Sequence, residues 1–239
     1  MSASTAKTRT ADKISSIASK GASKRSNSSI DNSSSELDSL LWRLSARTVS
    51  NDELGTIYGL TSCGPKSGVS TLATNLAIRA SNNHMGPVLL IDANFKSPQL
   101  HRIFRHDGKV GLMDLLVGSS TPEEAIRPTS VTDLDLLPLG SKETMRNGRI
   151  IPGNYADFTH WIRERYRTVF VDFPSIESMQ HSLMLARLTD TTIVAIRCEG
   201  ARRSEVSSAM ERLIEDGVKI GGTVLTRRRI YTPKWFRHA

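Results

Sequence analysis

Residues 61–71 could bind an anion, because their glycine and hydroxyl residues are spaced as in a phosphate-binding loop. They read Thr-Ser-Cys-Gly-Pro-Lys-Ser-Gly-Val-Ser-Thr. The consensus G-x-x-x-x-G-K-[ST] cradles phosphates with backbone N–H groups, and it places a lysine on the phosphates and a hydroxyl on Mg²⁺. Gly68 and Ser70 match the second glycine and the hydroxyl, but Val69 stands where the lysine belongs. The loop therefore keeps the pattern of a nucleotide site without its principal charge.

Two aspartates each follow an apolar run, which is typical of a buried strand that ends in a carboxylate. Asp92 follows residues 88–91, and Asp172 follows residues 169–171. Ligands of α/β proteins bind beyond the carboxyl ends of the strands, and carboxylates there hold Mg²⁺ directly or through water. Each aspartate alone would equally suit a turn or a helix N-terminus. In order with the loop, the two predict a metal site made by Ser70, Asp92 and Asp172.

Alternating strand and helix patterns surround these residues and would position them. The expected strands are residues 54–61, 87–91, 131–137, 168–172, 191–197 and 220–225. The expected helices are residues 36–47, 70–81, 155–166, 179–188 and 204–216. Strands that alternate with helices of this length predict a doubly wound α/β fold, with a mostly parallel sheet and helices on both faces.

Residues 1–35 differ in composition from the rest of the chain. They are rich in Ser, Ala, Thr and Lys, and they contain no aromatic residue. Such a segment buries too little apolar surface to offset the entropy lost on ordering. We therefore predict a disordered tail over residues 1–35 and one folded domain over residues 36–239.

The formal net charge of +8 suits an anionic partner such as membrane lipid, nucleic acid or polyphosphate, and it equally suits a soluble basic protein. Cys63 and Cys198 do not form a metal-ligand pattern, so we expect free thiols in a reducing cytosol. No window approaches the ~18 apolar residues of a membrane span, and the N-terminus lacks the apolar core of a signal peptide. The composition thus predicts a cytoplasmic protein.

Residues 227–239 combine basic and aromatic side chains. This combination favours docking on a membrane surface or on a protein. Nucleic-acid binding uses the same residue types, and a solvated C-terminus is the simplest alternative.

Several blocks of the chain have spacings that one known family shares. In the loop, the matches to T-S-x-x-P-G-E-G-K-S-T are Thr61, Ser62, Pro65, Gly68, Ser70 and Thr71. The other blocks are residues 89–101 against L-L-I-D-A-D-x-R-x-P-x-L-H, 111–118 against G-L-x-D-x-L-x-G, 137–140 against L-P-x-G, 166–175 against Y-D-x-V-I-I-D-x-P-P, and 221–235 against G-x-V-L-N-R-R-x-Y-x-x-P-x-W. Over about residues 36–236, the chain resembles the bacterial tyrosine-kinase-like ATPases of polysaccharide synthesis, a branch of the deviant P-loop MinD/ParA group.

The resemblance implies a P-loop NTPase-like fold of the MinD/ParA type and a role in exopolysaccharide or capsule assembly. The expected nucleotide-binding residues are Gly64, Lys66, Ser67, Gly68, Val69, Ser70 and Thr71. Asp92 and Asp172 would be vestigial catalytic residues and, with Ser70, the metal ligands. The implied partner is the cytoplasmic segment of an inner-membrane polysaccharide co-polymerase (Wzz/Wzc-like). Homo-oligomers and peripheral membrane contact through the basic ends are also implied, and no nucleic acid is expected.

The chain departs from the family pattern at positions that carry its chemistry. Val69 replaces the phosphate-binding lysine, and Asn94 replaces the second aspartate of the D-x-D motif. Thr226 replaces an asparagine that tends to contact adenine in the family, and Lys66 replaces a loop glycine. The family's assembly helix reads E-x-x-R-x-x-R, but Glu36, Ser39 and Trp42 occupy that register here. Tyr231 stands without the tyrosine cluster of the family's kinases.

Losing a lysine and a carboxylate should remove most catalysis, because each donor at a transferring phosphoryl group is worth about 2.7–4 kcal/mol. We therefore predict a non-catalytic or weakly nucleotide-binding regulator or scaffold, with ATP and Mg²⁺ bound weakly. One alternative is an active ATPase or tyrosine autokinase that uses Lys66 in place of the lost lysine. Another is a MinD/ParA-like positioning protein on membrane or DNA.

Overall fold

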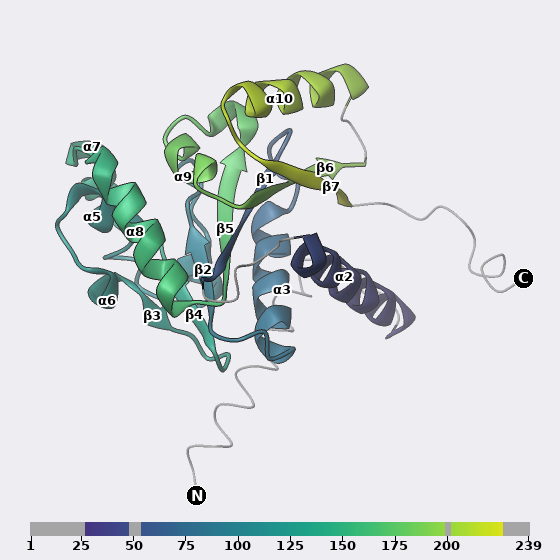
Figure 1. Ribbon diagram of the computed structural model, residues 1–239, viewed down its shortest axis with the longest axis horizontal. Helices are drawn as coiled ribbons and strands as arrows, with labels where there is room; N and C mark the ends of the chain where they lie inside the picture. The colour runs from purple at the N-terminus through teal and green to yellow at the C-terminus, as the bar shows by residue number, and fades with distance from the viewer. Residues whose placement is uncertain (1–26, 48–53, 199–201, 227–239) are drawn as a thin grey trace, which may run out of the picture.

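The computed structural model describes residues 27–47, 54–198 and 202–226. Its centre is a seven-stranded sheet with the order β3-β4-β2-β5-β1-β6-β7 (Figure 1). The strands are β1 (Thr56–Ser62), β2 (Val88–Asp92), β3 (Arg127–Pro128), β4 (Leu134–Leu137), β5 (Thr168–Ser175), β6 (Thr191–Arg197) and β7 (Ile220–Thr226). Every neighbouring pair is parallel except β3 with β4. The predicted doubly wound, mostly parallel fold is confirmed.

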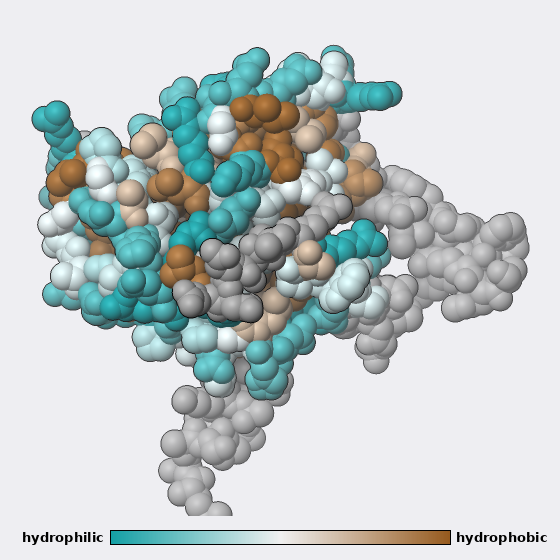
Figure 2. All heavy atoms as spheres, in the orientation of Figure 1, coloured by the Kyte–Doolittle hydropathy of each residue, from teal (hydrophilic) through white to brown (hydrophobic). Residues whose placement is uncertain are grey.

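Helices cover both faces of the sheet. The helices are α2 (Asn27–Arg47), α3 (Val69–Asn82), α4 (Leu100–Ile103), α5 (Leu112–Val117), α6 (Pro122–Ala125), α7 (Lys142–Asn147), α8 (Pro152–Arg165), the 3-10 helix η1 (Ile176–Ser178), α9 (Leu183–Arg187) and α10 (Arg203–Glu215). Residues of α2, α3 and α4 pack in one buried cluster, and residues of α5, α8, α9 and α10 pack in another. The face shown in Figure 2 is largely polar, with hydrophobic surface around one end of α10.

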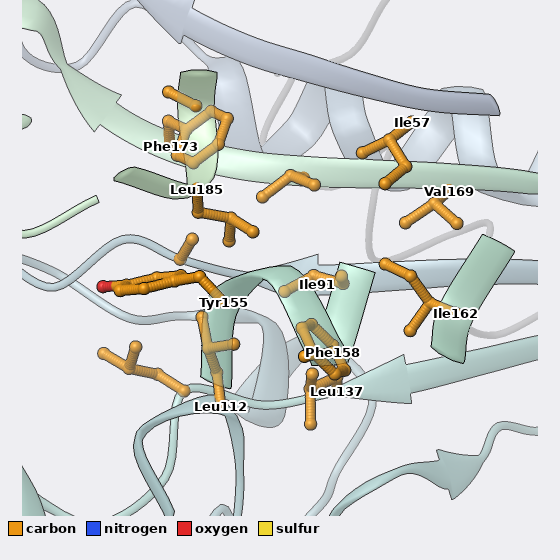
Figure 3. Packing of buried hydrophobic residues seen from close by; sticks show 14 of the residues in the cluster. Ile57, Ile91, Leu112, Leu137, Tyr155, Phe158, Ile162, Val169, Phe173 and Leu185 are labelled. Carbon is orange, nitrogen blue, oxygen red and sulfur yellow. The ribbon is translucent and has the colours of Figure 1, made fainter. Parts of the chain in front are cut away.

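The central strands are buried along almost their whole length because both of their faces are covered. Every residue of β2 is buried, and so is every residue of β5 except Ser175. Figure 3 shows the second cluster from close by: Leu112, Tyr155, Phe158 and Ile162 come from helices and meet Ile91 and Val169 of the sheet. This two-sided core fixes the strand ends on which the candidate site is built.

Several elements differ from the sequence-based prediction. Helix α2 begins at Asn27, nine residues before the helix expected from the sequence, and it includes residues 27–35 of the predicted tail. Residues 1–26 and 227–239 lie outside the described residues, and the tail over 1–26 stays a prediction. The helix expected over residues 179–188 is shorter in the structure, where α9 covers only Leu183–Arg187. The preceding 3-10 helix η1 ends at Ser178. Strand β3 and helices α4 to α7 were not predicted.

The G-L-x-D-x-L-x-G block has a structural role in this chain. Asp114 accepts hydrogen bonds from the backbone N–H of Gly111 at 2.8 Å and from the hydroxyl of Thr144 at 2.9 Å. Gly140 has a φ of 101°, and a Cβ there would lie 2.6 Å from the same carboxylate. The block therefore joins α5 to the segment that follows β4.

Arg163 of α8 holds the amino ends of β1 and β6 together. Its guanidinium donates to both carboxylate oxygens of Asp190, at 2.7 and 2.9 Å, and to the carbonyl of Gly55 at 2.8 Å. Asp190 also accepts from the backbone N–H of Ile57 at 2.7 Å. Because this ion pair is bidentate and partly buried, it positions the strand from which the phosphate-binding loop emerges.

Across the described ranges, no helix has both the length and the apolar character needed to span a bilayer.

Candidate functional site

The predicted phosphate-binding loop lies at the carboxyl end of the central strand β1. Strand β1 ends at Ser62, and α3 begins at Val69, so residues 63–68 form the turn between them. Gly68 caps the helix with a φ of 84°, a backbone conformation that favours glycine. A Cβ at Gly64 or Gly68 would have no heavy atom within 4 Å. The loop is therefore open on the side where a ligand would approach the helix N-terminus.

Hydroxyl groups fix the shape of this loop. Ser62 and Ser67 each donate to the carbonyl of Gly64 at 2.8 Å. The hydroxyl of Thr226, at the end of β7, donates to the carbonyl of Ser67 at 2.8 Å. The Ser67 side chain thus serves the loop itself, and a nucleotide contact by this residue would have to come from its backbone. Thr226, at the position where the family carries an asparagine, therefore connects the end of β7 to the loop.

Val69 occupies the lysine position with its side chain in the apolar core. It is 7% exposed and packs in the same cluster as Leu72 and Leu76 of α3. The nearest lysine along the loop, Lys66, is exposed, and within the described ranges it has no ion pair. Lys66 has a φ of 59°, where a non-glycine residue is strained by about 1–3 kcal/mol. The loop therefore offers one exposed ammonium, from a position different from that of the consensus lysine.

Asp92 and Asp172 are direct neighbours across β2 and β5, and both are fully buried. One carboxylate oxygen of Asp92 accepts from the N–H of Asn94 at 3.1 Å, and the other accepts from Gln99 and Leu100 at 3.0 Å each. Burial raises the pKa of Asp92 to about 6, although these backbone donors lower it. Asp92 therefore organises the turn that leads into α4.

Asp172 has no such support. Neither of its carboxylate oxygens has a hydrogen-bond partner within the described part of the chain. Burial, and then the charge of Asp92, raise the pKa of Asp172 well above its ordinary value, while the nearby Ser70 side chain lowers it. A buried carboxylate without partners is unfavourable unless it is protonated or faces a cation. Ser70 and Asp172 therefore fit a cation site. Both oxygens of the neighbouring Asp92 already accept backbone hydrogen bonds.

Asn94, at the position of the family's second aspartate, also serves the turn. Its side-chain oxygen accepts from the backbone N–H of Ser97 at 3.0 Å. Residues 94–100 thus fold back over the end of β2 and supply the donors that Asp92 needs.

An open pocket of about 560 Å³ lies between the loop and α10. Its wall includes Cys63 and Ser67 of the loop, Glu177 of η1, Arg197 at the end of β6 and Arg212 of α10. Cys63 and Cys198 are free thiols, as predicted, and burial raises the pKa of Cys63. Sequence reasoning missed the two arginines, because their approach to the loop depends on how α10 packs. Arg197 ends the expected strand over residues 191–197, and ligands bind beyond such strand ends, so its position was the one available signal.

Comparisons with known proteins agree with this geometry. No family model matches the chain. The tyrosine-protein kinase wzc of Salmonella typhimurium is 26% identical over 166 residues, which cover 70% of this chain and 23% of wzc. The putative tyrosine-protein kinase CapB of Staphylococcus aureus is 27% identical over 171 residues, which cover 72% of this chain and 75% of CapB. The chain thus spans less than a quarter of wzc and about three quarters of CapB.

Solved structures extend the similarity to the fold. The VpsO kinase domain has a TM-score of 0.65 and 25% identity, over 80% of this chain and 98% of that domain. The kinase domain of the Escherichia coli tyrosine kinase ETK has a TM-score of 0.71 and 21% identity, over 82% and 78% of the two chains. MinD of Pyrococcus horikoshii, solved with Mg-ADP, has a TM-score of 0.60 and 21% identity, over 72% and 70%. The homologues of this chain are bacterial tyrosine-protein kinases, and its fold is the P-loop fold of the MinD/ParA type.

Proposed function

We propose that this relative of the bacterial tyrosine-protein kinases is a non-catalytic or weakly nucleotide-binding component of exopolysaccharide or capsule biosynthesis. The observation that carries the proposal is Val69: the lysine position of the phosphate-binding loop holds an apolar side chain that is 7% exposed. The consensus lysine contacts the β- and γ-phosphates, so its loss removes a charge-assisted bond worth about 1.5–3 kcal/mol. In this proposal the chain acts as a regulator or scaffold of an inner-membrane polysaccharide co-polymerase.

The residues that remain fit a weakly held Mg²⁺–nucleotide. Asp172 is buried without a hydrogen-bond partner in the described residues, and Ser70 lies near it, so a cation between them would satisfy both. Magnesium, when bound, would neutralise phosphate charge at the loop. The backbone of residues 64–71 would hold the phosphates, with Thr71 in the first turn of α3. With the lysine absent, we expect affinity to fall by roughly ten- to a hundredfold.

The proposed partner is the cytoplasmic segment of the co-polymerase, and the proposed location is the inner face of the inner membrane. The resemblance of the motif blocks to the tyrosine-kinase-like ATPases of polysaccharide synthesis supports a partner of this kind. The net charge of +8 supports contact with anionic lipid. The proposed docking segment, residues 227–239, lies outside the described residues.

Calorimetric titration with ATP and Mg²⁺ tests the proposal. Wild type should give no heat of binding below about millimolar nucleotide, and Val69→Lys should bind at least about tenfold more tightly. Val69→Met is the matched control, because it introduces a long side chain at the same position without a charge. Micromolar binding by wild type would contradict the proposal.

The second candidate function is an active ATPase or tyrosine autokinase in which Lys66 supplies the missing charge. The observation that favours it is the strained φ of 59° at Lys66, because strained backbone often marks a functional site. Phosphotyrosine blotting of the purified protein separates the two functions. A strong signal that is lost in Lys66→Ala and kept in Lys66→Arg would establish the enzyme and exclude the scaffold.

A further inference from the structure

The open pocket between the phosphate-binding loop and α10, here called the α10 pocket, is built from four separate segments. They are the start of the loop, η1, the end of β6 and one face of α10 (Figure 1). The helix residues in its wall include Glu205, Ser208, Ala209 and Arg212, which recur at the spacing of a single helical face. Its volume of about 560 Å³ is typical of a site for a small molecule.

The apolar part of the wall is aliphatic. It consists of Pro65, Ile176, Val206 and Ala209, and none of the described residues that line the pocket is aromatic. Leu213 is the one fully buried residue of α10, so the face of the helix that lines the pocket is not filled by packing. The wall therefore suits the C–H groups of a saturated ring better than an aromatic base, which prefers to stack on an aromatic side chain.

Two guanidinium groups in the wall are available to an anion. Arg197 ends β6, Arg212 lies in the last turn of α10, and both side chains are exposed. Neither forms a salt bridge with another residue of the described ranges. Arginine presents a rigid fork of donors that matches the oxygens of a phosphate or a carboxylate. The pair therefore predicts a ligand with an anionic group.

The two carboxylates of the wall differ in what they bond to. Glu205 accepts from the backbone N–H of Arg202 at 3.4 Å and lies 4.0 Å from its guanidinium, so it serves the start of α10. Glu177 of η1 is exposed, and it forms no salt bridge within the described part of the chain. An ionised carboxylate accepts hydrogen bonds and repels an anion. Glu177 therefore favours a ligand that also carries hydroxyl donors.

We infer that the α10 pocket binds a sugar phosphate. Its phosphate would accept from Arg197 and Arg212, its ring hydroxyls would donate to Glu177, and the aliphatic wall would cover one face of the ring. Ser70, Asp92 and Asp172, the residues of the candidate cation site and its neighbour, do not line this pocket. The sugar phosphate site is therefore separate from the cation site, and it does not require that the loop bind nucleotide.

Calorimetric titration of the full chain with glucose 1-phosphate tests this site. Wild type should bind with a dissociation constant below about 1 mM, and Arg212→Gln should raise it at least about tenfold, because a charge-assisted hydrogen bond is lost. Arg203→Gln is the matched control: it removes the same charge from the first turn of α10, outside the pocket wall, and should leave binding unchanged. A wild type that binds no glucose 1-phosphate up to about 10 mM would overturn the inference. Equal losses in the two variants would overturn it as well, because they would reflect net charge alone.

Glu177→Ala distinguishes a sugar phosphate site from a simple anion site. The substitution should weaken glucose 1-phosphate binding about tenfold, because it removes the acceptor of the hydroxyls. It should not weaken the binding of inorganic phosphate, because it removes only a repulsive charge. If Glu177→Ala tightens the binding of both ligands, or if inorganic phosphate binds wild type as tightly as glucose 1-phosphate does, the pocket recognises an anion alone and the inference fails.

The two free thiols give an independent readout of where the ligand lies. Cys63 lines the pocket, whereas Cys198 is exposed and does not line it. Saturating glucose 1-phosphate should slow the alkylation of Cys63 by N-ethylmaleimide and leave that of Cys198 unchanged, as measured by mass spectrometry of the labelled peptides. Binding without protection of Cys63 would place the ligand elsewhere. Protection that persists undiminished in Arg212→Gln would also overturn the assignment.

Discussion

Strand β2 ends at Asp92, which pairs in register with Asp172 inside β5, and the two buried carboxylates differ in their hydrogen bonds. Asp92 and Asp172 are neighbours in register, and both are fully buried. Three backbone N–H groups stabilise Asp92, but no donor in the described residues bonds to Asp172. Burial alone therefore does not decide what a carboxylate does. Asp92, which accepts backbone hydrogen bonds, fixes the turn at the end of β2, whereas Asp172 remains available to bind a cation.

The largest expected effect on stability comes from removing Asp92, the carboxylate that accepts backbone hydrogen bonds. Asp92→Ala leaves the N–H groups of Gln99 and Leu100 without an acceptor and should lower the free energy of unfolding by about 3–4 kcal/mol. Chemical denaturation measures this change. Asp107→Ala is the control, because Asp107 is exposed and accepts one backbone bond at 3.2 Å, and its loss should cost under about 0.5 kcal/mol. Equal losses of stability in the two variants would mean that the backbone bonds to buried Asp92 stabilise the protein no more than one bond to an exposed aspartate does.

The pH dependence of stability should be the next largest effect. The pKa of Asp92 rises from 3.8 to about 6 on folding, so the folded protein binds this proton more tightly than the unfolded chain does. Stability from Asp92 is therefore fully present below about pH 4 and falls as the pH rises through 6, by roughly 2–3 kcal/mol. Asp172, whose pKa is also raised, extends the fall to higher pH. Denaturation at pH 5 and pH 7 measures the difference, and a higher stability at pH 7 would contradict it.

Removing the unsatisfied carboxylate should have the opposite sign. Asp172→Asn keeps the shape of the side chain and eliminates a buried charge, so at pH 7 it should stabilise the protein by about 1–2 kcal/mol. It should also flatten the pH dependence described above. A loss of stability in this variant would mean that Asp172 has a partner that balances its charge.

The smallest expected effect is stabilisation by Mg²⁺. At tenfold excess over its dissociation constant, the ion should raise the free energy of unfolding of wild type by about 1.4 kcal/mol. It should have no effect on Asp172→Asn, and Ser70→Ala should reduce the gain. Thermal melts with and without Mg²⁺ measure this. A gain that survives Asp172→Asn would place the ion elsewhere.

Long apolar segments made the fold predictable from the sequence. The expected strand over residues 191–197 agrees with β6, and the one over 220–225 agrees with β7 to one residue. Strand β3 and helices α4 to α7 were missed because two to six residues do not complete a periodic pattern. The start of α2 was missed because residues 27–35 are rich in serine, which favours caps and turns.

The residues of the candidate site were predictable from the sequence, but their hydrogen bonds and burial were not. The expected strand ends placed Asp92 and Asp172 together, and the two do pair in register, although β5 continues past Asp172 to Ser175. Their difference arises from residues 94–100, which fold back and donate only to Asp92. Val69 was recognised as a missing lysine, but its burial depends on packing against distant elements. The hydrogen bond from Thr226 to Ser67 joins residues 159 positions apart, and no local pattern reports it.

The strand order has a consequence for biosynthesis. Strand β1 is the first strand to be made, yet it lies between β5 and β6. Thr56 pairs with Thr168, and Tyr58 pairs with Thr191, so more than a hundred residues must be translated before either partner exists. At about 5–20 residues per second, the apolar β1 stays unpaired on the ribosome for roughly 5–25 s. Helix α3 follows β1 directly and packs against it, so it can shelter this strand before either partner strand is made.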